Sequence, residues 1–150
     1  MRCLVLCAWG AELARSLELI DELGVAEQVV WRPQLDRPRL IQHMKAADVV
    51  LDQMALPHFG ATAPQALAAG RPVVMSYRPE STAWIVDEPA PILAAFDPEG
   101  VAAAVDTAVD PDWRRVFEAT ARDWVNTYHH PRRIVREHCR IYRDVLGDHT

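Results

Sequence analysis

The chain has 150 residues, of which half are apolar and a quarter are charged, and its net charge is −5 at pH 7. Such a chain can fold as one domain with its own core, and a negative chain without an early basic run does not carry a nucleic-acid footprint. Its three cysteines, Cys3, Cys7 and Cys139, have no regular spacing. They exclude a disulfide scaffold and favour a reducing, cytoplasmic location.

Short apolar runs alternate with longer amphipathic stretches along the whole chain. The runs predict strands at 2–8, 28–31, 49–52, 72–75 and 92–96. The stretches between and after them predict helices at 12–23, 39–47, 62–69, 81–86, 97–109, 111–128 and 131–146. This order is typical of an α/β, Rossmann-like fold with an open, mostly parallel sheet and helices on both faces. We expect a single domain over 1–150, closed by the helices of about 111–146.

Two local patterns sharpen these predictions. The run 2–8 is continuously apolar, which predicts a strand covered on both faces. Asp97-Pro98 and Asp110-Pro111 each pair an N-cap acceptor with a proline suited to the first helical turn, so each predicts a helix start.

The stretch 48–75 predicts a strand, a loop, a helix of small residues and a second strand. Gly60 lies just before the helix, and Thr62 with Gln65 fits a capping box with Thr62 as the N-cap. Free amides at 60–63, helped by the helix dipole, favour an anion by about 0.3–1 kcal/mol. The pattern is neither a Walker A loop nor GxGxxG. From the residues alone, it indicates either an anion or nucleotide at a helix start or a structural turn at 59–60.

The C-terminal stretch gathers histidines and arginines. The histidines His129, His130 and His138 predict a solvated face rather than a metal site, since no acid or thiol stands at ligand spacing. The final helix carries the basic residues Arg132, Arg133, Arg136, Arg140 and Arg143. These arginines can pair with Glu137 and Asp144 along the helix, or contact an anionic membrane surface or a partner domain.

Several segments together resemble a known family. They are the leucine-rich helix that ends at Gly24, the runs 27–31 and 47–53, Phe59-Gly60, and the stretch 65–74. Their order is similar to that of the C-terminal, nucleotide-sugar-binding domain of a GT-B glycosyltransferase of the group 1 (GT4-like) family. The resemblance covers almost the whole chain and implies one half of a GT-B fold.

This resemblance implies a donor site for a nucleoside-diphosphate sugar. The loop 31–35 would lie along the nucleobase, and the amides of 58–62 would face the sugar and the diphosphate. The residues assigned to donor binding are Trp31, Arg32, Pro33, Gln34, Asp52, His58, Phe59, Gly60, Ala61, Thr62 and Gln65. No metal and no cofactor other than the donor are expected, because the stretch assigned to donor binding has no Asp-x-Asp pair. No catalytic base is assigned.

The chain departs from the family pattern at both of its acidic positions. Alignment on Phe59-Gly60 places Pro57 and Gln65 where the family has two acids, eight positions apart. Gln65 can still bond the ribose hydroxyls, but without the charge-assisted bond, a loss of about 1 kcal/mol. Asp52 and His58 are the candidates to replace the contact that Pro57 lacks.

The acceptor domain of a GT-B enzyme has no counterpart in this sequence. We therefore expect a donor domain that is inactive alone and works with an N-terminal domain or a partner chain. The resemblance implies retention of configuration. Two alternatives stay open from the sequence: a non-catalytic nucleotide-sugar-binding or interaction module, and half of a nucleotide-sugar epimerase.

Overall fold

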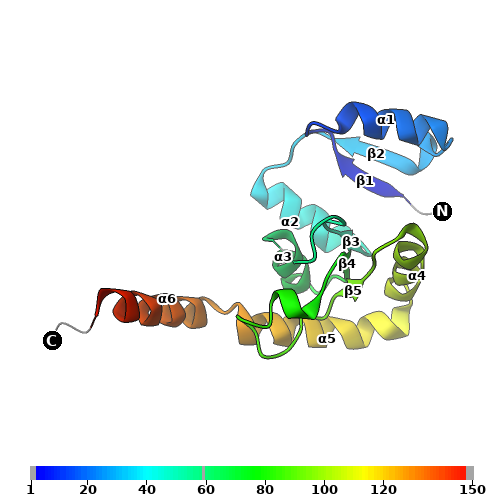
Figure 1. The fold of residues 1–150 in the computed structure, drawn as a ribbon. Helices are drawn as coiled ribbons and strands as arrows, with labels where there is room; N and C mark the ends of the chain where they lie inside the picture. The colour runs from blue at the N-terminus through cyan, green and yellow to red at the C-terminus, as the bar shows by residue number, and fades with distance from the viewer. Residues whose placement is uncertain (1–2, 59, 148–150) are drawn as a thin grey trace. The chain divides into compact units, whose positions relative to one another are not determined.

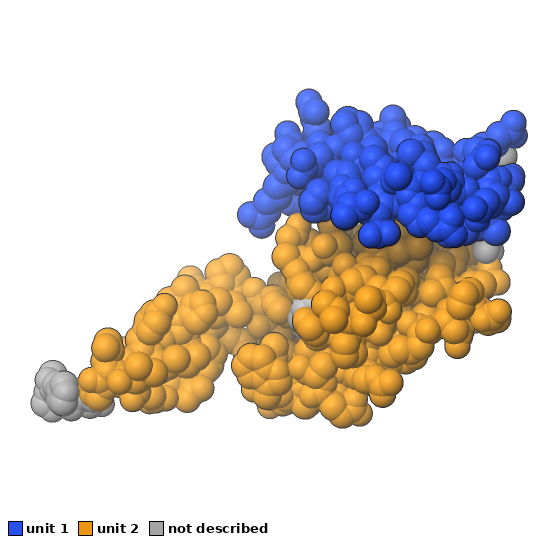
Figure 2. Space-filling model, turned by 45° about the horizontal axis from the view of Figure 1, so that its top comes forward, with its two compact units in different colours: residues 1–42 blue, residues 43–150 orange. Residues whose placement is uncertain are grey.

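The computed structural model of the chain describes residues 3–58 and 60–147 (Figure 1). It divides into two compact units, residues 1–42 and 43–150, which Figure 2 shows in different colours. Helix α2, Arg37–Ala46, contains the boundary between them. Each unit is described by itself below.

Unit 1 is a parallel strand pair with a crossover helix. Strand β1, Leu4–Cys7, pairs in parallel with β2, Val29–Arg32, and α1, Leu13–Glu22, connects them with the short 3-10 helix η1, Ala26–Gln28. Leu4 and Val5 are 40% and 49% exposed, and no described residue of unit 1 is fully buried. The prediction that β1 is covered on both faces is therefore wrong within this unit, because the apolar run has only one helix and one strand beside it.

Unit 2 contains a three-stranded parallel sheet. Its order is β3, Val50–Leu51, then β4, Val73–Met75, then β5, Leu93–Ala94. The register pairs Val50 with Val73 and Val74 with Leu93. All three residues of β4 are fully buried, so the middle strand forms the centre of the core.

Helices surround this sheet. Helix α3, Thr62–Ala68, and α4, Pro98–Ala108, both contact β4, and α5, Pro111–Tyr128, packs against α3 and α4 (Figure 1). Val74, Ala95 and Ala104 form one core cluster between β4, the end of β5 and α4. Small residues dominate the faces of α3 and α4 that are buried, which lets the helix backbones approach the sheet closely.

The α/β, Rossmann-like class is confirmed, and so are the predicted parallel pairings. The structure differs from the expected single open sheet in one respect, since its strands are hydrogen-bonded as a pair and a triplet. The single domain expected over 1–150 stays a prediction.

The two Asp-Pro helix starts have the geometry that the sequence predicts. The Asp97 carboxylate accepts from the Gly100 amide at 2.7 Å, and Asp110 accepts from the Trp113 amide at 2.8 Å. In contrast, the predicted helix at 81–86 is reduced to the 3-10 helix η2, Pro79–Ser81, followed by turns. Ser81 ends that element rather than capping a helix start, because its hydroxyl bonds backward to the carbonyls of Pro57 and Arg78.

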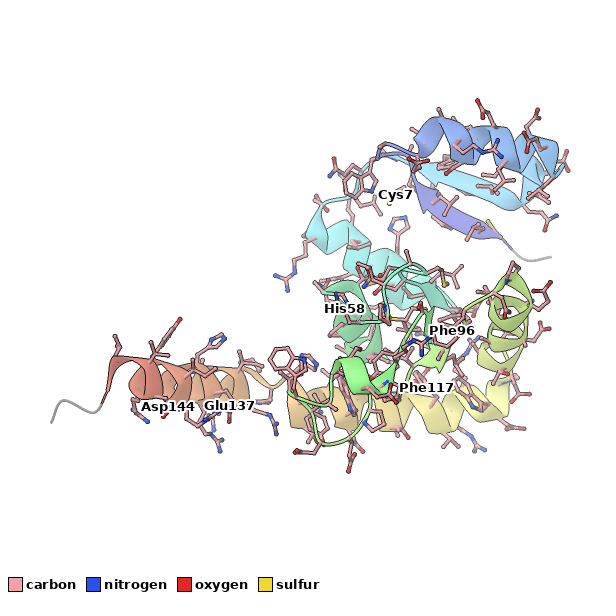
Figure 3. The ribbon with its side chains drawn as sticks, viewed as in Figure 1. Cys7, His58, Phe96, Phe117, Glu137 and Asp144 are labelled. Atoms are coloured by element: carbon pink, nitrogen blue, oxygen red, sulfur yellow. The ribbon has the colours of Figure 1, made fainter. Side chains whose placement is uncertain are left out.

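Helix α6, Pro131–Leu146, runs beyond the end of α5 and away from the β3–β5 sheet (Figure 1). None of its residues is buried. Apolar side chains occupy one side of it, and Val135, Val145 and Leu146 are 61%, 76% and 72% exposed. The other side carries the arginines, with Glu137 and Asp144 among them (Figure 3).

The packing of α3 on β4 leads to a stability prediction. Leu67 is fully buried on α3. We expect Leu67→Ala to lower the free energy of unfolding by about 2–5 kcal/mol, since it removes buried methyl groups and leaves a cavity. Urea denaturation followed by circular dichroism measures the loss. The control is Val116→Ala on α5, where Val116 is 66% exposed and a change within about 0.5 kcal/mol is expected. Equal effects of the two substitutions would contradict the assigned core.

Candidate functional site

The loop between β3 and α3 is held in place by the segment that follows β4. The Ser76 amide donates to the Gln53 carbonyl at 3.1 Å, and the Arg78 amide donates to the Pro57 carbonyl at 3.0 Å. The Ser81 hydroxyl donates to the same Pro57 carbonyl at 2.8 Å. These bonds fix both ends of 53–57 against a segment whose own path is set by buried β4.

A bond inside the loop closes it further. The side-chain amide of Gln53 donates to the backbone carbonyl of His58. His58 belongs to the loop that joins β3 to α3, and its side chain is exposed (Figure 3). The loop therefore folds back on itself just before Gly60, and a polar side chain at its tip faces solvent.

Asp52 lies at the carboxyl end of β3, where its backbone amide donates to the Val74 carbonyl at 3.0 Å. Its carboxylate accepts from the backbone amides of Gln53 and Ala63. The second oxygen, Oδ2, is buried and has no hydrogen-bond partner among the described residues. Burial raises the pKa of Asp52 above its ordinary value, and the two amides oppose this effect without cancelling it.

The start of α3 differs from the predicted capping box. Ala61 is the N-cap, with helical backbone angles and no capping side chain, and Thr62 is already inside the helix. The Thr62 capping prediction is wrong because the Gln65 amide, which a cap at residue 62 would serve, donates to the Ala61 carbonyl at 3.4 Å. The Ala63 amide is met by the Asp52 carboxylate. One of the amides expected to be free for an anion is thus engaged by a side chain from β3.

Gln65 lies one turn into α3 and is half-buried. Its side-chain oxygen Oε1 is buried, with no hydrogen-bond partner among the described residues. Gly60 and Ala61 are exposed, so the backbone between the loop and α3 is open to solvent. Phe59, which the sequence also assigns to donor binding, lies outside the described residues.

The remaining predicted site residues lie in unit 1, at the end of β2. Trp31 is half-buried, whereas Arg32, Pro33 and Gln34 are exposed. Trp31 lines a hollow of about 260 Å³ at the carboxyl ends of β1 and β2. Its other walls are made by Leu6, Cys7, Trp9, Gly10, Ala11, Glu12, Leu13 and Ser16.

The sequence reading did not include Trp9 and Gly10 among the site residues, although a signal for them was present. Gly10 has a φ of 103°, a conformation that favours glycine, and it turns the chain between β1 and α1. A glycine between a strand and a helix is the same feature that pointed to the loop before α3.

The arginines near the β3–α3 loop are directed elsewhere. The Arg71 guanidinium, just after α3, lies 3.9 Å from the Glu118 carboxylate of α5. The Arg78 guanidinium lies over the Phe96 ring, 5.3 Å from its centroid. Anion binding at this loop would therefore rely on backbone amides.

Among residues 3–58 and 60–147, no three or more His, Cys, Asp or Glu side chains are grouped so that they could hold a metal ion. Within the same ranges, no helix has the length and hydropathy needed to cross a membrane.

Comparison with known proteins decides the family. The model of the family described as glycosyl transferases group 1 matches residues 3–124. The chain belongs to this family. The resemblance found in the sequence is thus confirmed, and the Rossmann-like units are those of a GT-B glycosyltransferase.

Two relatives are informative. The chain is 29% identical over 146 residues to a D-inositol 3-phosphate glycosyltransferase of Acidothermus cellulolyticus, a match that covers 93% of this chain and 31% of the relative. A solved sucrose-phosphate synthase from Thermosynechococcus elongatus superposes with a TM-score of 0.71 and 25% identity, covering 91% of this chain and 35% of that one. The chain spans about a third of the length of both.

In this glycosyltransferase domain, Asp52 is a half-buried acid whose ionised form the fold disfavours. Because its pKa is raised above 3.8, the folded chain keeps the proton to higher pH than the unfolded chain does. Ionised Asp52 thus lowers the free energy of unfolding above its folded-state pKa. This cost shrinks as the pH falls toward 3.8 and is absent below it.

We expect Asp52→Asn to raise the melting temperature at pH 7, since the substitution removes the charge and keeps a side-chain oxygen for the amides. The gain should shrink toward pH 3.8 and vanish below it. Thermal unfolding across this pH range measures the effect. The control is Asp87→Asn, at an exposed aspartate of the same unit, where no gain is expected. A loss of stability with Asp52→Asn at pH 7 would show that its charge stabilises the fold.

Proposed function

We propose that this chain is the donor-binding part of a glycosyltransferase and holds a nucleoside-diphosphate sugar at the β3–α3 loop. The observation that carries the proposal is the pair of buried oxygens without a partner among the described residues, Asp52 Oδ2 and Gln65 Oε1, which precede and follow the exposed residues Gly60 and Ala61 in the sequence. A buried polar atom without a partner costs about 1–3 kcal/mol, so such atoms cluster where a ligand completes the bonding.

The groups at this loop match the chemistry of a sugar nucleotide. Oxygens that only accept are suited to hydroxyl groups, which a ribose or a sugar ring supplies. Backbone amides at 60–62 are suited to phosphate oxygens. The donor's ribose and sugar would bond to Gln65 and Asp52, and its diphosphate would face the exposed backbone. Stabilising the leaving diphosphate in this way is electrostatic catalysis of the oxyanion-hole kind.

The unit 1 residues Trp31, Arg32, Pro33 and Gln34 keep their predicted role toward the nucleobase. The hollow beside Trp31 supports this role, since it has two indole side chains in its walls and lies at the carboxyl ends of parallel strands. An aromatic wall can stack on a base, and this hollow is large enough for one ring system.

Transfer to an acceptor is proposed for the whole protein to which such a domain belongs. The family match supports glycosyl transfer, and the A. cellulolyticus relative carries a glycosyltransferase name. The acceptor, an N-terminal domain or partner chain, the absence of a metal requirement and a cytoplasmic location are parts of the same proposal. Retention of configuration follows from the family resemblance alone.

A second candidate is a binding module that does not catalyse transfer. It is favoured by Pro57, which has no polar side chain and whose carbonyl is occupied by Arg78 and Ser81. The two candidates share the donor site. They differ in whether the chain, supplied with an acceptor domain, turns over its donor.

Donor binding can be measured on the chain itself by isothermal titration calorimetry with UDP-, GDP- and ADP-sugars. We expect one class of donor to bind at or below millimolar concentration. Gln65→Ala should weaken that binding by about fivefold, since one neutral hydrogen bond is worth about 1 kcal/mol. Gln65→Glu should strengthen it, because the bond to a ribose hydroxyl becomes charge-assisted.

The matched control is Gln42→Ala, at an exposed glutamine of α2, which should leave the affinity unchanged. Circular dichroism verifies that each variant is folded. The proposal is wrong if no donor binds at millimolar concentration, or if Gln65→Ala and Gln42→Ala bind the donor equally well.

A further inference from the structure

A second hollow lies where α5 ends and α6 begins, within unit 2. Its volume is about 390 Å³. Asn126 and Thr127 line it from α5, and His130, Arg132, Arg133 and Arg136 line it from the junction and from α6. Every lining residue follows residue 124, the last one that the family model matches. The hollow shares no residue with the predicted donor site.

Positive charge accumulates around this hollow without compensation. Arg132 and Arg136 form no ion pair with a described residue, and Arg133 lies over the Tyr128 ring at 5.0 Å from its centroid. Glu137 also lines the hollow, and its carboxylate lies 3.0 Å from the Arg140 guanidinium, which also pairs with Asp144. Three arginines thus line the hollow with one carboxylate, and that carboxylate is paired with Arg140.

The charge of Arg133 affects the pKa of His129 nearby. The pKa of His129 is lowered, first by burial and then by the nearby Arg133 guanidinium. Like charges disfavour one another when they are close and partly desolvated. The position of Arg133 therefore creates a local positive potential that an anion would relieve.

The start of α6 shows which groups are left to bind a ligand. His130 Nδ1 accepts from the Arg132 amide at 3.2 Å, and Pro131 has no amide hydrogen. The Arg133 amide donates to the His130 carbonyl at 2.9 Å. The helix amides are thus satisfied locally. An imidazole that accepts at Nδ1 carries its proton at Nε2, so His130 is a further donor beside the arginines.

We propose that this hollow is a second anion site, which binds a phosphate group. Guanidinium groups bond phosphate oxygens in bidentate fashion, and several arginines around one hollow favour a doubly charged phosphate over a single carboxylate. Its contacts are Arg132, Arg133 and Arg136, with His130 as an additional donor. The site is independent of the donor-binding proposal, because it uses none of the same residues.

Two sources can supply this phosphate. One is a small soluble anion such as inorganic phosphate or pyrophosphate. The other is a lipid headgroup, since α6 also exposes Val135, Val145 and Leu146 on its apolar side. The chemistry recognised is the same in both cases, so the experiment has a soluble arm and a vesicle arm.

The soluble arm is a titration of the full chain with inorganic phosphate and pyrophosphate at low salt, followed by amide shifts in NMR. We expect shifts at 126–137 that saturate. Arg132→Gln with Arg136→Gln should weaken this binding by about tenfold or more, since two charge-assisted contacts are lost. These arginines are exposed, so the variant should fold normally, as its melting temperature will show.

The matched control is Arg143→Gln, on the same helix but outside the hollow, paired with Gln65→Ala at the donor loop. Both should leave the shifts at 126–137 unchanged. Arg136→Lys keeps the charge but loses the bidentate fork, and should bind between the parent chain and the double variant. The proposal would be overturned if Arg143→Gln lost as much phosphate binding as the double variant, because the phosphate would then be attracted only by the net charge of the helix.

The vesicle arm uses phosphatidylcholine vesicles with and without phosphatidic acid. Sedimentation with phosphatidic acid that depends on Arg132 and Arg136 identifies a headgroup as the source. Soluble binding without sedimentation identifies a free phosphate. If neither arm shows binding that depends on these arginines, the hollow is not an anion site. Donor titrations are unaffected by that outcome, so the two proposals fail separately.

Discussion

The parallel pairing of β4 with β3 is the constraint on which the candidate donor loop depends. Val73, Val74 and Met75 are fully buried, so β4 cannot shift without opening the core. The Val74 carbonyl of β4 accepts a hydrogen bond from the Asp52 amide. The amide of Ser76, the first residue after β4, donates to the Gln53 carbonyl. These hydrogen bonds thus set the position of the loop relative to the middle strand of the sheet.

Much of this arrangement was predictable from the sequence because it follows local rules. At the Asp97 and Asp110 helix starts, the capping carboxylate accepts a hydrogen bond from the amide three residues later. The structure contains both of these bonds. The run of β4 and the small-residue helix after the loop were predicted from composition and spacing alone. The family was recognised because its segments occur in order along the chain, a property that needs no knowledge of packing.

What the sequence could not show depends on contacts between distant residues. Thr62 does not cap the helix because α3 begins one residue earlier, at the Ala61 N-cap, so Thr62 already lies inside it. Ser81 does not cap a helix start because its hydroxyl donates a hydrogen bond to the carbonyl of Pro57, 24 positions earlier. The arginine-lined hollow needs the end of α5 beside the start of α6, and a helical wheel of either helix alone does not reveal it.

The two proposed anion sites differ in the groups that would contact a negatively charged ligand. Near the β3–α3 loop the described arginines contact other groups, since Arg71 is paired with Glu118 and Arg78 lies on Phe96. Neutral amides and unpartnered oxygens remain there, and such groups select for the shape and hydroxyl pattern of a ligand. At the α5–α6 junction Arg132, Arg133 and Arg136 line the hollow, and the phosphate site proposed there would select for charge. A sugar nucleotide needs the first kind of recognition, because its diphosphate is common to many metabolites while its hydroxyl groups distinguish it. Recognition by charge is suited to a phosphate group when the rest of the molecule that carries it need not be distinguished.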